Sequence, residues 1–208
     1  MTNDKIVRKI AVIFVTDVVG FSKLMEKNED ATLKSLRACR EILDRLFEEH
    51  GGRIFNTAGD SVLAEFQSAV SAVICATEFQ KLIKQRNQSV AEASQMHFRL
   101  GLNMGDVIVE GTNLYGDGVN VAARLEALSQ PGGVSLSKAI HDFVSQKVEL
   151  TFADLGSQKV KNTVLHAYDV TIDGLEERVL ETTTEPVKEI ESKPPTIAVL
   201  PFLNLSND

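Results

Sequence analysis

Two aspartates, Asp17 and Asp60, stand where predicted strands end. Asp17 follows the β-branched run Lys9 to Val15, and Asp60 follows Gly59 at the expected tip of a hairpin. Carboxylates are the ligands that Mg²⁺ and Mn²⁺ prefer, and two of them can bridge two ions about 3.5 to 4 Å apart. Each aspartate taken alone is better explained as a helix cap or a turn residue. The pair predicts a metal site only if the two strand ends lie side by side.

A second polar pair, Asn120 and Arg124, is spaced four residues apart on a helix predicted from Gly118 to Leu128. This spacing places both side chains on one helix face, where an arginine can reach a phosphate group. The plainer alternative is that Arg124 is solvated or ion-paired with Asp117 or Glu126 and that Asn120 is a local cap.

The elements that must position these residues alternate between strands and helices in the order expected for a ferredoxin-like βαββαβ unit within an α/β (α+β) fold. This order favours contact between the end of the first strand and the hairpin tip. The predicted strands are Lys9–Val15, Arg53–Thr57, Val62–Phe66, His97–Asn103, Val107–Val109, Val134–Leu136, 150–152 and 167–170. The predicted helices are Asn28–Glu49, Ala69–Arg86, Gly118–Leu128 and 139–144.

The composition narrows the class of protein. With 208 residues, 43% of them hydrophobic, the chain can bury one sizeable core. A net charge of −7 argues against nucleic-acid binding, and the sheet lacks the aromatic pattern of RNA-recognition domains that share its skeleton. No apolar run approaches the ~20 residues of a membrane span, so we expect a cytoplasmic protein. Cys39 and Cys75 are expected to be buried, reduced thiols.

The composition changes after Thr171. Residues 173–195 are acidic, rich in threonine and end in prolines, as is typical of an interdomain linker. Residues 196–208 return to a strand-like pattern that is too short to fold alone. We therefore expect a domain over residues 1–172, a linker over 173–195, and the first strand of a further, truncated C-terminal domain over 196–208.

Four ordered motifs resemble the class III adenylate and guanylate cyclases between Arg8 and Val170. They are FVTDVVGFS, the Gly59-Asp60 hairpin, RLGLNMGDVIVEG and YGDGVNVAARLE. The resemblance implies the class III nucleotide cyclase fold and a head-to-tail homodimer whose active sites are shared between subunits. Residues 196–208 resemble the start of the TolB-like modules that often follow such domains.

The resemblance also implies a role for each polar residue in converting ATP to 3′,5′-cyclic AMP and pyrophosphate. Asp17 and Asp60 would bind two Mg²⁺ or Mn²⁺ ions, assisted by the backbone carbonyl of Val18. Asn120 and Arg124 would stabilise the transition state.

The phosphate-binding lysine of the family lies near the last hairpin, where Lys161 is our choice by alignment. Lys159 lies close enough to compete for this role. Both lysines are explained equally well as surface residues.

The base-recognition positions depart from the family pattern. Where well-known adenylate cyclases have a lysine and an aspartate, this chain has Asn56 and Asn113. A carboxamide offers a donor and an acceptor, so either adenine or guanine can be satisfied, and a backbone-only role is also open. Because most bacterial members make cyclic AMP, we favour ATP over GTP.

A regulatory module that binds nucleotide without catalysis is the main rival from another class. The presence of both carboxylates, the asparagine and the arginine argues against it.

Overall fold

Strand β1 (Val7–Val18) runs through the middle of a mixed sheet and carries Asp17 as its penultimate residue. The computed structural model describes residues 6–172, Leu175 and Arg178. Residues 11–16 of β1 are all buried, as expected for a strand that is covered on both faces. The strand is longer at both ends than its apolar run predicts.

The sheet confirms the ferredoxin-like order in its first four strands, which lie as β2 (Gly52–Ala58), β3 (Ser61–Phe66), β1 and β4 (Phe98–Glu110). The sheet continues through β6 (Val134–Ser137) and β8 (Thr163–Val170) to β7 (Phe152–Val160), while β5 (Asn113–Tyr115) pairs with β4. All neighbouring strands are antiparallel except β4 and β6. The fold is therefore the mixed α+β type that the sequence predicts.

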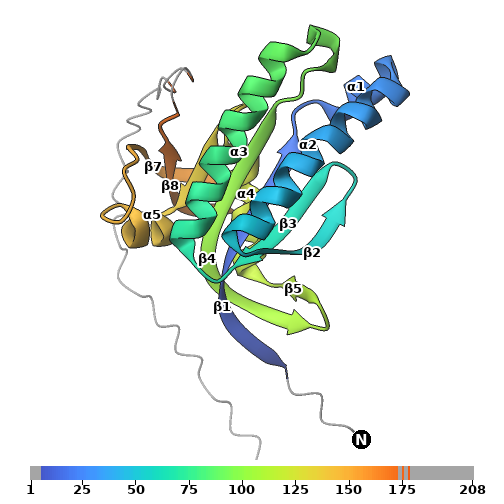
Figure 1. The fold of residues 1–208 in the computed structure, drawn as a ribbon. Helices are drawn as coiled ribbons and strands as arrows, with labels where there is room; N and C mark the ends of the chain where they lie inside the picture. The colour runs from blue at the N-terminus through green and yellow to red at the C-terminus, as the bar shows by residue number, and fades with distance from the viewer. Residues whose placement is uncertain (1–5, 173–174, 176–177, 179–208) are drawn as a thin grey trace, which may run out of the picture. The chain divides into compact units, whose positions relative to one another are not determined.

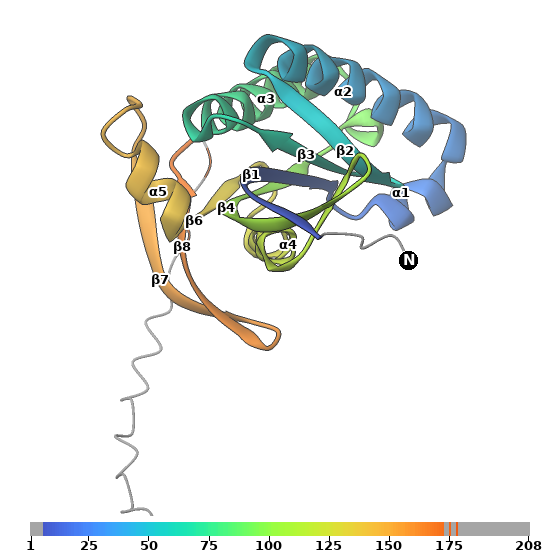
Figure 2. The ribbon, with the colours of Figure 1, turned by 90° about the horizontal axis from the view of Figure 1, so that it is seen from below.

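Helices cover both faces of this sheet. Helices α2 (Glu29–His50) and α3 (Ala69–Ser89) lie on one face, and α4 (Asp117–Leu128) lies on the other, as Figures 1 and 2 show. The shorter helices are α1 (Phe21–Lys27), α5 (Lys138–Val144) and the 3₁₀ turn η1 (Glu92–Ser94). Among the described helices, α4 covers its face of the sheet alone. One side of α4 therefore packs on the sheet, and the other side can carry exposed residues.

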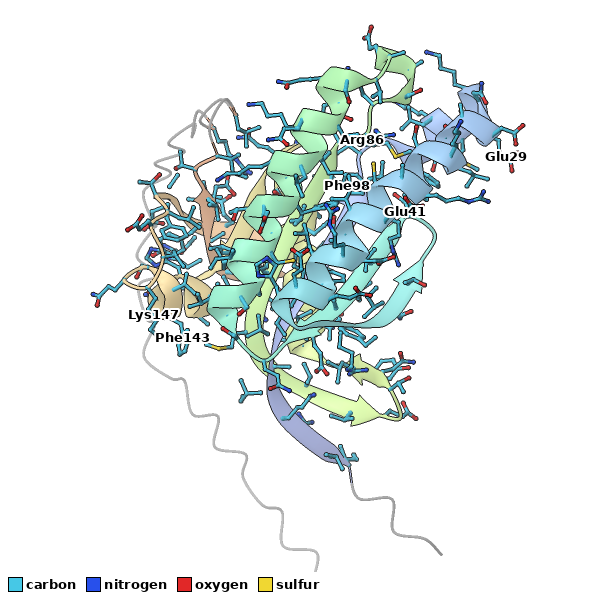
Figure 3. All side chains as sticks on the ribbon, in the orientation of Figure 1. Glu29, Glu41, Arg86, Phe98, Phe143 and Lys147 are labelled. Atoms are coloured by element: carbon cyan, nitrogen blue, oxygen red, sulfur yellow. The ribbon has the colours of Figure 1, made fainter. Side chains whose placement is uncertain are left out.

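The larger core lies under α2 and α3. Phe14, Phe47 and Phe66 pack ring to ring with centroid distances of 5.2 to 5.8 Å, which adds directional aromatic contacts to the burial of apolar area. Figure 3 shows Phe98 inside the molecule beneath these helices, whereas Glu29 projects from the outer end of α2. This core holds α2 and α3 on the face of the sheet opposite to α4, which carries Asn120 and Arg124.

Local signals fix the ends of α2 as predicted. The side chain of Asn28 accepts a hydrogen bond from the N–H of Ala31 at 3.0 Å, which satisfies one free donor of the first turn. Gly51 ends the helix in the left-handed region with φ 74°.

Strand β4 corrects one prediction. We expected two strands separated by a turn at Met104-Gly105-Asp106, but β4 is continuous. These residues pair with β1, Gly105 opposite Ala11 and Asp106 opposite Ile10, so their backbone lies in the ladder. The true turn follows Glu110 and leads into β5. Helix α1 was not predicted, because it is only seven residues long, although Phe21, Leu24 and Met25 have helical spacing and Phe21 and Leu24 pack against the core.

Cys39 and Cys75 are buried and unpaired, as predicted, and burial raises the pKa of Cys75 to about 12.

Across residues 6–172, no helix is both long and apolar enough to cross a bilayer. The predicted linker and the strand-like segment 196–208 lie outside the described residues, apart from Leu175 and Arg178. Arg178 donates to the carbonyl of Leu128 at 2.8 Å, at the end of α4.

Candidate active site

The end of β1 and the tip of the β2–β3 hairpin bring Asp17 and Asp60 together. The N–H of Val18 donates to Oδ2 of Asp60 at 3.1 Å, and the hydroxyl of Ser61 donates to the carbonyl of Thr16 at 3.3 Å. Gly59 adopts φ 61° at the hairpin tip, a left-handed conformation that glycine enters without steric cost. The two strand ends therefore lie side by side, which is the condition under which Asp17 and Asp60 predict a metal site.

The two carboxyls form a site that attracts cations. Partial burial raises the pKa of Asp17 to about 6, with further contributions from the charge of Asp60 and a side-chain hydrogen bond to it. Arg99 opposes this rise only partly, because its Nη2 lies 3.9 Å from Oδ2 of Asp17. Two carboxylates crowded in this way favour a proton or a metal ion between them.

Arg99 lies directly opposite Asp17 in the ladder between β1 and β4. Its Nε lies 3.1 Å from Oε1 of Glu126 on α4. Both of these atoms are buried and neither completes a hydrogen bond of good geometry, so the attraction between them is mainly electrostatic. Burial raises the pKa of Glu126 to about 7, and Arg99 counteracts this rise.

Helix α4 carries the second polar pair on its outer side. Asn120 is exposed, while the Arg124 side chain is 22% exposed and its Nη1 is buried without a hydrogen-bond partner. The nearest ion pair of Arg124 is to Asp117 at 3.8 Å, which is too long for a hydrogen bond. Of the two partners that the sequence offered, Asp117 is the one observed, because Glu126 faces Arg99 instead.

Close backbone packing holds α4 on the sheet. A Cβ at Gly101 of β4 would lie 2.1 Å from the N of Glu126 and 2.3 Å from the O of Ala122, so only glycine fits there. The buried side chain of Asn103 donates to the carbonyl of Gly118 at 2.9 Å and anchors the start of the helix. These contacts determine where Asn120 and Arg124 project.

The candidate base-recognition residues lie on neighbouring parts of the fold. Asn56 is exposed on β2, and Asn113 begins β5, where its Nδ2 donates to the Tyr115 hydroxyl at 3.3 Å. Arg53 connects the two strands, because its Nη1 donates to the carbonyl of Thr112 at 2.8 Å.

The β7–β8 hairpin packs against α4 through Val160, which contacts a cluster containing Leu125. Lys161 follows Val160 in the turn, with φ 55°, and both Lys161 and Lys159 are exposed. The hairpin therefore brings both lysines near α4 without distinguishing between them.

A family model described as the adenylate and guanylate cyclase catalytic domain matches residues 3–172. The chain belongs to this family.

Individual relatives agree with this membership. The chain is 41% identical over its whole length to a Rhizobium meliloti (strain 1021) protein named "Putative adenylate cyclase 3", of which it covers 36%. It is also similar to the crystal structure of an adenylate/guanylate cyclase/hydrolase from Silicibacter pomeroyi, with 37% identity and a TM-score of 0.75. That match covers 81% of this chain and all of the other. The adenylyl cyclase CyaB from P. aeruginosa, at 24% identity and a TM-score of 0.69 over 85% of this chain and 98% of the other, agrees in fold. The chain spans less than half the length of the curated relatives it matches.

The cyclase domain has a donor set that fits divalent ions. Asp17 and Asp60 offer carboxylate oxygens beside one another, and the pKa of Asp17 is raised first by burial and then by the negative charge of Asp60. Among the described residues, no group of three or more His, Cys, Asp or Glu side chains could hold a metal ion, so a metal at this site would have two carboxylate residues and no third such side chain. The cyclase domain also has a cavity of about 350 Å³ beside α3, lined by residues that include Gln80, Asn87 and His97 but no carboxylate. The two aspartates are therefore the best metal-binding candidate in the described part of the domain.

Three residues of the cyclase site escaped prediction, namely Arg99, Asn103 and Gly101. All three lie in the motif RLGLNMGDVIVEG, which marked the family but carried no local chemical pattern. Only the register between β1 and β4 reveals that Arg99 faces Asp17.

Proposed function

We propose that the chain is the catalytic domain of an adenylate cyclase, which converts ATP to 3′,5′-cyclic AMP and pyrophosphate. The observation that carries the proposal is the contact between the Asp17 and Asp60 carboxyls at the end of β1. These two residues, with the Val18 carbonyl, would hold two Mg²⁺ or Mn²⁺ ions. Such ions, when bound, acidify a ribose 3′-hydroxyl and neutralise the charge of a triphosphate.

The residues of α4 supply the complementary half of the chemistry. When the 3′-oxygen attacks the α-phosphorus and the bond to pyrophosphate breaks, negative charge develops on the α-phosphate oxygens. The Nη1 of Arg124, which makes no hydrogen bond, can donate to that charge, and Asn120 is positioned on the same face to assist. Lys161, or Lys159, would bind the outer phosphates from the hairpin.

The two halves belong to different copies of the chain in this proposal. Arg124 and Glu126 are two residues apart, so they point about 160° away from one another around the helix. Glu126 faces Arg99, which lies next to Asp17 in the same subunit. Arg124 therefore faces away from its own aspartates, which favours a homodimer whose active sites combine Asp17 and Asp60 of one subunit with Asn120 and Arg124 of the other.

ATP is the favoured substrate because the relative that is 41% identical carries the name of an adenylate cyclase. Asn56 and Asn113 are compatible with either purine, so a guanylate cyclase is the second candidate. The purified domain should be incubated with Mn²⁺ or Mg²⁺ and with ATP or GTP in separate reactions at high protein concentration. Chromatography should identify cyclic AMP as the main product. Bound nucleotide without a cyclic product would favour the regulatory module.

A further inference from the structure

Arg99 lies between two carboxylates that the proposed reaction uses differently. Its Nε is 3.1 Å from Oε1 of Glu126, and its Nη2 is 3.9 Å from Oδ2 of Asp17. The guanidinium is therefore closer to the carboxylate that binds no metal in the proposed site. A guanidinium pairs readily with either carboxylate, so the position of Glu126 determines how closely the Arg99 guanidinium approaches Asp17.

The position of Glu126 is fixed by the backbone rather than by its own side chain. The Glu126 side chain is 11% exposed, and its main-chain N lies where a Cβ at Gly101 would come within 2.1 Å. The strand that carries Arg99 and the helix that carries Glu126 are thus in direct main-chain contact. The backbone positions that carry the two side chains are therefore held close together.

We propose that Glu126 is a positioning residue, which holds the guanidinium of Arg99 away from Asp17 and so leaves the Asp17 carboxylate available to a divalent cation. The inference rests on the proposed function, because it assigns Asp17 to metal binding. Without the Glu126 charge, Arg99 would close the remaining distance to Asp17 and compete with the metal for the same oxygens.

The test is the affinity of the domain for Mn²⁺ alone, measured without nucleotide from the electron paramagnetic resonance signal of free Mn²⁺. At pH 8.5, above the pKa of Glu126, Glu126→Gln should weaken Mn²⁺ binding about tenfold. Arg99→Gln combined with Glu126→Gln should restore the affinity to within about threefold of wild type, because the competing cation is then absent. A role confined to stability predicts no such restoration.

Glu65→Gln is the matched control. Glu65 is 14% exposed and forms ion pairs with Arg53 and Lys9 on the same sheet. Its backbone lies opposite Ile13 of β1, which is about 13 Å along the strand from Asp17. This variant should bind Mn²⁺ like wild type.

The outcomes separate this inference from the proposed function. If wild type binds no Mn²⁺, the metal site and the inference both fail. If wild type binds Mn²⁺ and Glu126→Gln binds it equally well, the inference alone is overturned. Should Glu126→Gln not fold, which circular dichroism would detect, the double variant still decides, because an affinity more than about tenfold below wild type contradicts the proposal.

Discussion

The backbone N–H of Val18 donates to Oδ2 of Asp60 over 3.1 Å, joining the end of β1 to a hairpin tip that lies 42 residues later in the chain. The bond is made by the main chain, so it does not depend on which side chain occupies position 18. It holds the Asp60 carboxyl beside Asp17, at the cost of crowding two negative charges.

Asp60→Asn should abolish cyclase activity yet stabilise the metal-free domain at neutral pH. The pKa of Asp17 is raised to about 6, first by burial and then by the Asp60 charge. A raised carboxyl pKa means that the folded state is favoured below the unfolded pKa of 3.8 and loses that advantage as pH rises through about 6. Removing the Asp60 charge should lift the part of this penalty that the charge causes, while the larger part, which comes from burial, remains.

Thermal unfolding in EDTA at pH 4.5 and pH 8 measures this effect. The gain in melting temperature of Asp60→Asn over wild type should be larger at pH 8. An equal gain at both pH values would show that charge repulsion with Asp17 is not its origin.

Gly101→Ala should destabilise the domain by at least about 2 kcal/mol, because the new Cβ would meet the backbone of Glu126 and Ala122 at 2.1 and 2.3 Å. Denaturant unfolding measures the loss. Gly105→Ala on the same strand is the control, since its nearest contact is the Asn103 side chain at 3.3 Å. Similar losses in the two variants would contradict the tight contact between α4 and β4.

Asn103→Ala should lower both stability and turnover. The variant loses the hydrogen bond that holds the Gly118 carbonyl at the start of α4, worth about 1 to 2 kcal/mol. The control is Asn87→Ala. Asn87 is another buried asparagine, near the end of α3, and its side chain donates to the carbonyl of Met96 at 2.7 Å. This variant should cost similar stability but leave kcat unchanged. Equal effects of both variants on kcat would argue against a role for Asn103 in positioning α4.

The double substitution Asn56→Lys with Asn113→Asp should increase the preference for ATP over GTP about tenfold. These are the residue types that well-known adenylate cyclases have at the two positions, and an amide pair discriminates less between the purine edges. The ratio of kcat/KM for the two nucleotides measures the change. An unchanged ratio would favour a purely structural role for both asparagines.

The sequence predicted those parts of the site that depend on local signals. Asn28 and Gly51 mark the ends of α2, and Gly59 marks the hairpin that carries Asp60. The spacing of Asn120 and Arg124 correctly predicts a shared helix face.

The remaining features depend on the pairing of strands far apart in the chain. Arg99 faces Asp17 only through the register of β1 with β4, and no local pattern encodes a register. The same pairing keeps Gly105 and Asp106 within a strand, although their residue types favour a turn. Helix spacing already places Glu126 on the opposite side of α4 from Arg124, but it cannot reveal that the partner of Glu126 is Arg99 on the sheet.

Complementation between two inactive variants tests the composite site most directly. Asp17→Ala and Arg124→Ala should each be folded and inactive alone, because each lacks one half of every site. Mixed in equal amounts, they should recover up to about one quarter of wild-type cyclic AMP formation, since half of the dimers then contain one intact site of two. No recovery, with heterodimers demonstrated by differential tagging, would contradict an active site built from Asp17 and Asp60 of one subunit and Arg124 of its partner.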